Sequence, residues 1–526
     1  MPEIHPPCPF EENVSLSTVG YYGIGGTARW LARPGSVGEL AGLLGWCRRN
    51  RIPVIVTGKG SNMLFSDEWF PGVVVTTASM KRLWRVSEDE IFCEAGVENS
   101  EVSIRLMELG MSGGEWLYRL PGMVGATVRM NGRCYGLEAS AVTVGVATVG
   151  LDGTVRWRSK EEVFLGYKQT SLMDGGEIVA GAMLRFPGRK SPDEIRRAMD
   201  EYEGDREAKH QFDFPSCGST FKNSYAAGRP SGQIFESLGF KGCRHGGAKV
   251  SDHHANFIFN TGGAKATEVL RLASAMRTAA RARERVELEL EVQCAGLFDS
   301  ELLEECGVPS VPDTNQPGMS WAGLLKFPEG ESTAFPRRLI QGALLDYSGA
   351  DSRFPSGVQV CVEQLLPVSE ARKHPGRPLL RWSTVDESGQ AFPFSPAMEA
   401  GFVDRLWEYS VSELFIGGEG GYLEFEATPR GHWVAIRFDG VRRRAAGHET
   451  PDEGLWKGSV APFATGGEFG MELSYELLEP FISEGELRMQ CCASLGEGGF
   501  GLFPWWGEAG KPDFHQPERF CPVTLV

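Results

Sequence analysis

A serine, a lysine and an amide lie close together at 215–223, where the chain reads PSCGSTFKN. Gly218 allows the backbone to turn sharply, so the hydroxyl of Ser219 can be presented at a bend. Lys222 and Asn223 follow, and they add a cationic donor and a neutral donor and acceptor beside that hydroxyl. Taken alone, the segment is typical either of a polar surface turn or of a site that uses these three groups together.

Two further segments place small residues where a ligand could approach the backbone. In 57–62 (TGKGSN), which follows the apolar run 54–56, alternate glycines let successive N–H groups converge, as in loops that bind a pyrophosphate. The spacing is not that of a Walker A loop, and a plain strand-end turn is the alternative. In 120–131 (LPGMVGATVRMN) the small residues would let a flat ring approach the main chain.

Composition describes a soluble protein with several domains. The chain has 526 residues, 41% hydrophobic and 23% charged, so we expect two to four domains. A net charge of −16 argues against nucleic-acid binding through an overall basic surface. We expect no membrane segment, because no apolar run approaches about 20 residues. The 12 cysteines contain no C-x-x-C pair and favour a reducing cytoplasm, and no metal site is expected.

Several motifs follow the serine turn in a fixed order: GFKG at 239–242, GGAKVS at 246–251 and HANFIFN at 254–260. With the turn and the two glycine-rich segments, they resemble the flavin-dependent UDP-N-acetylenolpyruvoylglucosamine reductases of peptidoglycan synthesis. The resemblance implies a cytoplasmic oxidoreductase of cell-wall biogenesis. It would use FAD and NADPH to reduce UDP-N-acetylglucosamine enolpyruvate to UDP-N-acetylmuramate.

The resemblance also assigns roles to single residues. Ser219 occupies the position of the family's proton donor, and Glu291 matches the catalytic glutamate of an L-x-x-E-V motif. Lys168 stands where the family typically has an arginine that stabilises the enolic intermediate, so charge is kept while the planar fork is lost; an ordinary surface lysine is the alternative. We expect Asn223 and Lys241 to hold the substrate, with Lys241 near the diphosphate.

The same resemblance implies that FAD binds non-covalently between the two glycine-rich segments. Neither segment contains a His or Cys that could tether the flavin. Arg133, where the family usually has glycine, is a departure close to the second segment. The expected contacts are Gly58, Lys59, Gly60, Ser61, Asn62, Pro121, Gly122, Gly125, Ala126 and Asn131.

The sequence predicts an α+β fold with successive domains, whose helices and strands must position these residues. The resemblance implies a two-part FAD-binding α/β region of the vanillyl-alcohol-oxidase type, then an α/β substrate domain. We expect a chain ending near Phe298 to keep its flavin and activity, because the part beyond looks separable. The expected boundaries are 15–80 and 81–192 for the FAD-binding subdomains, 193–298 for the substrate domain, 299–334 for a linker or packed extension, and 335–526 for a β-sandwich.

The C-terminal part consists of short alternating runs between Gly, Pro and Asp, which predict strands of a sandwich. It resembles the DOMON-like, family-nine-type carbohydrate-binding sandwiches, and this implies a glycan as a further partner. Trp433, Trp505 and Trp506 could stack on a sugar, although sandwich tryptophans are more often core. Three hypotheses stand: an active reductase, a catalytically weakened flavin or sugar-nucleotide binder, and a glycan-recognition module on a degenerate enzyme.

Overall fold

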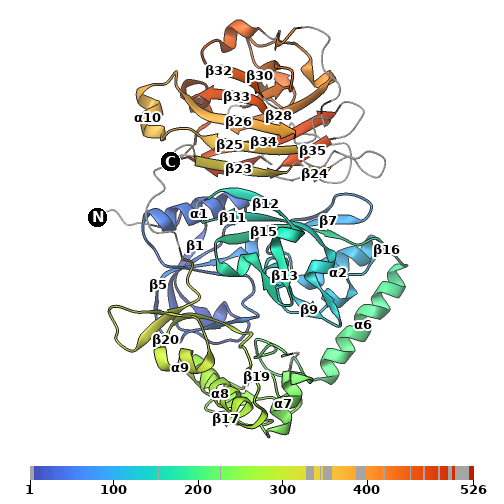
Figure 1. The fold of residues 1–526 in the computed structure, drawn as a ribbon, viewed down its shortest axis with the longest axis vertical. Coiled ribbons are helices and arrows are strands. Elements are labelled where there is room, and N and C mark those ends of the chain that lie inside the picture. Colours follow the sequence, from blue (N-terminus) through green and yellow to red (C-terminus); the bar gives the residue numbers. More distant parts are fainter. Residues whose placement is uncertain are drawn as a thin grey trace.

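The molecule is arranged in three tiers (Figure 1). The C-terminal half, drawn in orange and red, lies above a central α/β region, and a third part that contains α8 and α9 lies below it. Among the described residues, no helix has the length and apolar character needed to cross a membrane. The computed structural model describes residues 5–151, 153–224, 227–326, 337–343, 345–346, 358–386, 392, 399–418, 421–450, 452–465, 468–483, 486–495, 500–503 and 520–525.

The first part of the chain is a four-stranded sheet of order β1-β2-β5-β3, in which β2, β5 and β3 run parallel. Helix α1 buries Leu40, Leu43 and Leu44 against this sheet. The helix begins where the Ser36 hydroxyl accepts the N–H of Glu39, as a helix N-cap does. The bounds are β1 Phe10–Ser15, β2 Thr27–Ala32, α1 Val37–Arg49, β3 Val54–Thr57, β4 Met63–Phe65 and β5 Phe70–Thr76.

The second part contributes five antiparallel strands in the order β12-β11-β15-β7-β6. Its helices cover one face through a buried cluster that includes Val102, Leu106 and Val124. The bounds are β6 Leu83–Arg85, β7 Glu90–Glu94, α2 Asn99–Glu108, β8 Met111–Ser112, α3 Val124–Arg129, β9 Arg133–Cys134, β10 Leu137–Glu138, α4 Ala139–Val142, β11 Thr143–Gly150, β12 Val155–Ser159, α5 Lys160–Val163, β13 Phe164–Gly166, β14 Gln169–Thr170, β15 Glu177–Arg185 and β16 Gly188–Arg189.

The third part begins with the long helix α6 and returns to the first part through β20, which pairs in parallel with β4. On its other side β20 pairs with β22, and α9 buries Leu302 and Leu303 in the same core. Residues 300–322 are therefore a packed extension and not a linker. The bounds are α6 Pro192–Ala208, α7 Ser231–Ser237, β17 Arg244–His245, β18 Ala248–Val250, β19 Ile258–Asn260, α8 Ala266–Ala279, β20 Gln293–Asp299, α9 Ser300–Cys306, β21 Val311–Pro312 and β22 Met319–Ala322.

Two sheets enclose a large apolar core in the C-terminal half. Trp433 lies in this core, 5% exposed and edge-on to Phe402, so the preference for a core role is confirmed; Trp505 and Trp506 lie outside the described residues. The bounds are β23 Arg337–Ala343, β24 Leu345–Asp346, β25 Val358–Gln364, α10 Val368–Lys373, β26 Pro378–Asp386, β27 Gly401–Phe402, β28 Ser410–Gly418, β29 Gly421–Ala427, β30 His432–Gly440, β31 Arg443–Arg444, β32 Val460–Thr465, β33 Glu468–Ser474, α11 Tyr475–Leu478, β34 Glu486–Leu495, β35 Phe500–Phe503 and β36 Cys521–Thr524.

One continuous sheet joins the two halves. Strand β23 pairs in parallel with β12, with Val155 opposite Ile340, so five strands of each half form a single ten-stranded sheet. A buried cluster also spans the boundary and packs Trp84 and Phe92 with Phe415 and other residues of the C-terminal half. The halves therefore share a sheet and a core, which differs from the expectation of a separable C-terminal body.

Three glutamates are buried in the C-terminal half. Glu413 lies on β28 and is paired with Glu426 on the neighbouring strand β29, which also carries Glu424. Their exposed fractions are 4%, 0% and 4%, respectively. Neither carboxylate oxygen of Glu426 has a hydrogen-bond partner within the described part of the chain. Burial of charge without compensation is costly, so these groups favour their protonated forms.

Candidate active site

The loop after β3 forms one wall of the candidate site. Gly60 has φ 66°, and a Cβ there would lie 2.8 Å from the Cα of Gly20, so this position requires glycine. Thr76 Oγ1 donates to the carbonyl of Gly58 at 3.1 Å. Lys59 Nζ pairs with Glu98 at 2.8 Å. The loop is thus held in a defined shape by its own backbone and by its neighbours.

The segment before and within α3 forms the facing wall. Gly125 donates its N–H to the carbonyl of Ala95 at 2.9 Å, and a Cβ on Gly125 would lie 2.8 Å from the Cβ of Ala95. Ser61 Oγ donates to the carbonyl of Pro121 at 3.3 Å and so links the two walls. The small residues noted in the sequence therefore serve close packing of α3 as well as access to the cavity.

A first cavity of about 990 Å³, its open mouth included, lies between these walls. Thr57 Oγ1 lines it and is buried without a hydrogen-bond partner in the described residues. Ile178, Val179 and Met130 give the cavity an apolar side. Seven of the expected flavin contacts line this cavity: Gly58, Lys59, Gly60, Ser61, Asn62, Gly125 and Ala126.

Arg129, at the end of α3, supplies a cation to the first cavity, although no pattern in the sequence marks it as a site residue. Burial lowers the pKa of its guanidinium, and its Nη2 donates to the carbonyl of Met173 at 3.1 Å. Cys294 also lines the cavity, but burial raises the pKa of its thiol well above the ordinary value. It is therefore a poor nucleophile for tethering a cofactor.

A second cavity of about 1630 Å³, its open mouth included, adjoins the first and shares Ser61, Asn62, Ala126 and Met130 with it. Pro121 and Gly122 line the second cavity. Ser219, Lys168, Glu291 and Asn223 line it as well, although they come from distant parts of the chain. The structure thus brings together all three residues expected to be catalytic.

Lys168 and Glu291 form an ion pair between Nζ and Oε1. Their side chains are 14% and 16% exposed, so the pair is largely shielded from water. Asn62 Nδ2 donates to the carbonyl of Glu291 at 3.0 Å, and the N–H of Glu291 donates to the carbonyl of Thr220 at 2.8 Å. The loop of the first cavity, the glutamate and the serine turn are therefore joined by hydrogen bonds.

The serine turn is held by the segment 254–257. Gly218 has φ 70°, which agrees with the sharp bend expected there. The N–H of Thr220 donates to the carbonyl of Asn256 at 2.7 Å. The Asn256 side chain, 2% exposed, bonds both backbone groups of Phe221. A rigid backbone thus positions the hydroxyl of Ser219 at the wall of the second cavity.

Three further residues were predicted from the sequence to contact a ligand, and only one of them lines a cavity in the described part of the chain. Asn223 lines the second cavity while its Oδ1 accepts the N–H of Ser231 at 3.0 Å, at the start of α7. Lys241 is paired with Glu236 at 2.6 Å and, among the described residues, is not part of either cavity wall. Asn131 is 1% exposed and also lies outside both linings.

The buried Asn131 has a structural reason for its position. Its Nδ2 donates to the carbonyl of Gly166 at 3.0 Å, and its Oδ1 accepts the N–H of Ser140 at 3.0 Å. Both ends of the amide are thus used to join backbone segments. Because Gly166 lies two residues before Lys168, Asn131 supports the turn that carries the lysine.

Arg133 lines the second cavity, and its guanidinium lies 5.5 Å from the centre of the Tyr167 ring. Sequence reasoning missed other residues of this wall, among them Lys209, Phe257 and His254. Burial lowers the pKa of His254, which keeps its imidazole neutral near pH 7. The HANFIFN motif contained two of these residues, but a motif does not say which of its side chains face a cavity.

The first cavity suits a large ligand with a flat ring and a charged chain. The apolar side and the small residues allow a ring to approach the backbone, the unpartnered hydroxyl of Thr57 offers a hydrogen bond, and Arg129 offers a positive charge. A mixed apolar and polar lining of this kind fits FAD. The adjoining second cavity leaves room for a second molecule beside it.

Comparisons with known proteins agree with this division. Residues 28–159 match a family described as FAD binding domain, and residues 210–295 match the UDP-N-acetylenolpyruvoylglucosamine reductase, C-terminal domain. The UDP-N-acetylenolpyruvoylglucosamine reductase of Synechococcus sp. (strain JA-3-3Ab) is 32% identical over 293 residues, which are 56% of this chain and 93% of that protein. The protein of the same name from Syntrophomonas wolfei is 33% identical over 291 residues, 55% of this chain and 96% of that protein.

A crystal structure of UDP-N-acetylenolpyruvylglucosamine reductase from Thermus caldophilus is 30% identical in sequence, covers 53% of this chain and 97% of that chain, and has a TM-score of 0.46. The sequence matches reach almost the whole length of the curated relatives. The matched ranges contain both glycine-rich segments that form the walls of the first cavity, the serine turn and Glu291. The chain belongs to the UDP-N-acetylenolpyruvoylglucosamine reductase family.

Proposed function

We propose that this protein is an NADPH-dependent flavoprotein oxidoreductase that reduces UDP-N-acetylglucosamine enolpyruvate to UDP-N-acetylmuramate, a step of peptidoglycan precursor synthesis. The observation that carries the proposal is the meeting of Ser219, Lys168 and Glu291 at one cavity beside the glycine-rich first cavity. Because the chain belongs to the reductase family, we assign these three residues to the chemistry of the family's reaction.

FAD would occupy the first cavity. When bound, it would carry the hydride from NADPH to the substrate. The loop 57–62 would hold the cofactor through its backbone, and Gly125 and Ala126 would let a ring lie against α3. Arg129 would face its negative charge. Binding without a covalent tether remains our prediction, and the raised pKa of the Cys294 thiol supports it.

Lys168 is assigned, as a cation, to the negative charge that develops when hydride is added to the enolpyruvyl group, and Glu291 is assigned as the acid at the same place. An ammonium has three N–H donors, and one of them is directed at Glu291. The others can be directed at a substrate carboxylate. Because the pair is shielded from water, a charge interaction there is stronger than at the surface.

Ser219 is assigned the protonation of C2 of the enolpyruvyl group, which is the carbon next to C3, the one that receives the hydride. A serine hydroxyl is a weak acid in water, so this role requires a strongly basic carbanion directly beside it and a route for replacing the proton. The turn that carries Ser219 is fixed by Asn256 and by the backbone bond to Glu291. This rigidity supports the assignment, since proton transfer needs a donor at a fixed position.

The sugar nucleotide would lie in the second cavity. Asn223 is retained as a substrate contact because it lines this cavity. Lys241 remains a prediction only, and its ion pair with Glu236 does not support it. Arg133 and Lys209 line the same cavity and are better placed to meet a diphosphate, whose charge favours cationic partners.

A single assay tests the proposal. Purified flavoprotein is mixed with NADPH, and NADPH consumption is followed before and after the enolpyruvyl sugar nucleotide is added. An active reductase consumes NADPH in proportion to the substrate. A protein that is yellow and binds the sugar nucleotide, but leaves NADPH consumption unchanged, would instead fit the alternative of a weakened binder.

For the C-terminal half we keep the DOMON-like resemblance and the glycan partner as proposals. The two packed sheets support the first. The burial of Trp433 in the core does not support its use in sugar stacking. Glycan binding by the full-length protein, measured beside a chain ending at residue 326, would test the second proposal: equal binding or none in both proteins would contradict it.

A further inference from the structure

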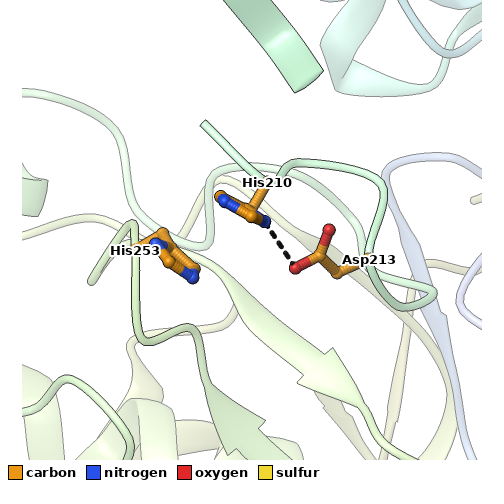
Figure 2. A group of neighbouring side chains, drawn as sticks. All are labelled: His210, Asp213 and His253. Atoms are coloured by element: carbon orange, nitrogen blue, oxygen red, sulfur yellow. Dashed lines mark hydrogen bonds and ion pairs between the residues drawn. The ribbon is translucent and has the colours of Figure 1, made fainter. Parts of the chain in front are cut away.

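Three side chains with metal-binding groups, His210, Asp213 and His253, lie close together (Figure 2), and their neighbours in the chain line the second cavity. His210 Nδ1 lies 2.9 Å from Asp213 Oδ2, and the rings of His210 and His253 are stacked with their centres 3.8 Å apart. One potential ligand atom from each of the three residues lies within 4.8 Å of the other two. All three side chains are accessible to solvent.

The backbone on both sides of the cluster is ordered by hydrogen bonds. His210 follows the end of α6 with φ 55°, and its N–H donates to the carbonyl of Glu207 at 2.9 Å. Ser251 Oγ accepts the N–H of His253 at 3.1 Å and that of His254 at 3.2 Å. The backbone that carries His210 and His253 is therefore held by hydrogen bonds.

The donor set indicates which ligand would fit. Two imidazole nitrogens and one carboxylate oxygen are ligands of Zn²⁺ and similar transition metals, whereas Mg²⁺ and Ca²⁺ prefer oxygen alone. With metal–ligand bonds of about 2.0–2.1 Å in a tetrahedron, ligand atoms lie about 3.3 Å apart. His210 Nδ1 and Asp213 Oδ2, 2.9 Å apart, lie slightly closer than this, and the other ligand atoms lie within 4.8 Å, so rotation of the stacked imidazole rings would bring all three residues to one ion. Within the described ranges, no side-chain hydrogen bond occupies the ring nitrogens of His253, so both remain accessible.

The cluster connects two segments of the cavity wall. Lys209 and Phe212 flank His210 and Asp213, and both line the second cavity. His254 follows His253 and lines the same cavity from the other side. A metal ion held between the two segments would fix their separation beside the second cavity.

We propose that His210, Asp213 and His253 bind one divalent transition-metal ion of the Zn²⁺ class and so tie the segment 209–214 to the turn 251–254. Three protein ligands leave one position for water. The site is distinct from the Ser219, Lys168 and Glu291 centre, and its occupation does not require the proposed reductase activity.

The test uses the full-length flavoprotein without a polyhistidine tag, after chelator treatment. Zn²⁺ is added in a calorimetric titration, and Co²⁺ in a parallel absorption titration that reports the ligand type. We expect one ion per chain at micromolar concentration, and a Co²⁺ spectrum without thiolate charge-transfer bands. Mg²⁺ in the same titration should not compete. Zn²⁺ should also raise the melting temperature, since it binds the folded state.

The decisive comparison is between ligand variants and a matched control. His253→Ala and Asp213→Asn should each weaken Zn²⁺ binding at least tenfold, whereas His245→Ala, which removes an exposed histidine of β17, should leave binding unchanged. Retention of flavin and of the circular dichroism spectrum shows that each variant is folded. Absence of stoichiometric binding in the parent, unchanged binding in both ligand variants, or a spectrum with thiolate bands would each overturn the proposal.

Discussion

Lys168 has a backbone conformation that few residues with a side chain adopt. Its φ is 49°, and it lies in the two-residue turn between β13 and β14. Such left-handed positions are uncommon outside glycine and are a reason to look for function. The tight hairpin directs the lysine at Glu291, and Asn131 bonds the carbonyl of Gly166 at the start of the turn. Backbone geometry, and not side-chain length alone, thus sets where the ammonium lies.

Replacing Lys168 by methionine tests the role of its charge. Lys168→Met removes a charged hydrogen bond made mainly in the transition state, and such deletions cost ~2.7–4 kcal/mol, or 10²–10³ in rate. We expect the loss in the reoxidation of reduced flavin by substrate, with flavin reduction by NADPH spared. Stopped-flow measurement of both half-reactions checks this.

Lys168→Arg should lose less activity than Lys168→Met, because the positive charge is kept. Some loss should remain, because the longer, planar guanidinium must fit a place that holds a compact ammonium. Lys373→Met is the matched control, since Lys373 forms an ion pair with Glu370 on α10, far from the cavities. If Lys168→Met reacted at the parent rate, the charge would have to come from another group, and Arg133 would be the next to test.

Ser219→Ala tests the proton donor. Flavin reduction by NADPH needs no proton from Ser219 and should proceed nearly as in the parent. Reoxidation by substrate should slow by roughly 10²–10⁴-fold, the usual contribution of a positioned proton donor. Ser216→Ala, a change three residues earlier at a buried hydroxyl, serves as a control for disturbance of the turn. Equal losses in both half-reactions would identify Ser219 as a structural residue.

Sequence and structure agree most closely at the site where chemistry restricts the choice of residues. The glycines of 57–62 and the serine turn could be recognised because close backbone approach and sharp bends require small residues. Lys168 and Glu291 could be paired only through the family resemblance, since 123 positions separate them. His254 and Lys209 line the second cavity but could not be predicted, because nothing in the sequence distinguishes a histidine or lysine that lines a cavity from one on the surface. Asn131 stays a predicted flavin contact, although its buried amide bonds two backbone segments, a role that the sequence does not reveal.

At the level of elements, β20 connects the parts of the N-terminal half. It pairs with β4 on one side and with β22 on the other. The chain then continues to Gly323, where a Cβ would lie 2.5 Å from the carbonyl oxygen of Cys294, and to Leu325, whose N–H donates to the carbonyl of Val54. Both of these residues line the first cavity. The segment 300–326 therefore completes the wall of the proposed flavin site.

Shortening the chain tests this element. A chain ending near Phe298 loses α9, β22 and two residues of the first cavity, so we now expect it to lose flavin, in contrast to our expectation from the sequence. A chain ending at residue 326 keeps these contacts and should retain more flavin. The ratio of flavin absorbance to protein after gel filtration measures the difference. Equal flavin content in the 298-residue chain and the full-length protein would contradict the argument.

At the scale of the whole molecule, the C-terminal half covers a sheet edge and an apolar face. Strand β23 pairs with β12, which would otherwise be an edge strand with unpaired backbone groups. Trp84, Phe92 and Met183 of the N-terminal half are buried in a cluster shared with the C-terminal half. A boundary in a Pro- and Gly-rich stretch predicted a separate domain, but sequence patterns do not reveal pairing between strands as distant as β12 and β23.

The buried glutamates make the stability of the C-terminal half depend on pH. Burial raises the pKa of Glu413 to about 7 and that of Glu424 to about 8, and it raises the pKa of Glu426 as well. Below pH 4.5, the ordinary value for glutamate, all are protonated in both states. As the pH rises toward 8, the unfolded chain releases protons that the folded state keeps. The free energy of unfolding should therefore fall by up to ~1.4 kcal/mol per pH unit for each group.

Glu424→Gln replaces one of these titratable carboxyl groups by an amide of nearly the same shape. We expect the variant to lose less stability than the parent between pH 5.5 and pH 8, as measured by denaturant unfolding at each pH. Glu476→Gln, an exposed carboxylate of α11, is the control and should follow the parent. Comparison with the parent cancels the opposite contribution of His254, whose lowered pKa favours the folded state as the pH rises. Identical pH profiles in Glu424→Gln and the parent would disprove the assignment.

The shared sheet also has a consequence for synthesis of the chain on the ribosome. Strand β12 and the apolar face around Trp84 are translated long before β23 and Phe520 can cover them. At roughly 5–20 residues per second, the interval between the synthesis of β12 and that of β23 is on the order of 10–40 s, and the interval between Trp84 and Phe520 is on the order of 20–90 s. For that time the nascent chain presents an unpaired strand and an apolar surface. We therefore expect its yield in cells to depend on translation speed and on chaperones that bind nascent chains.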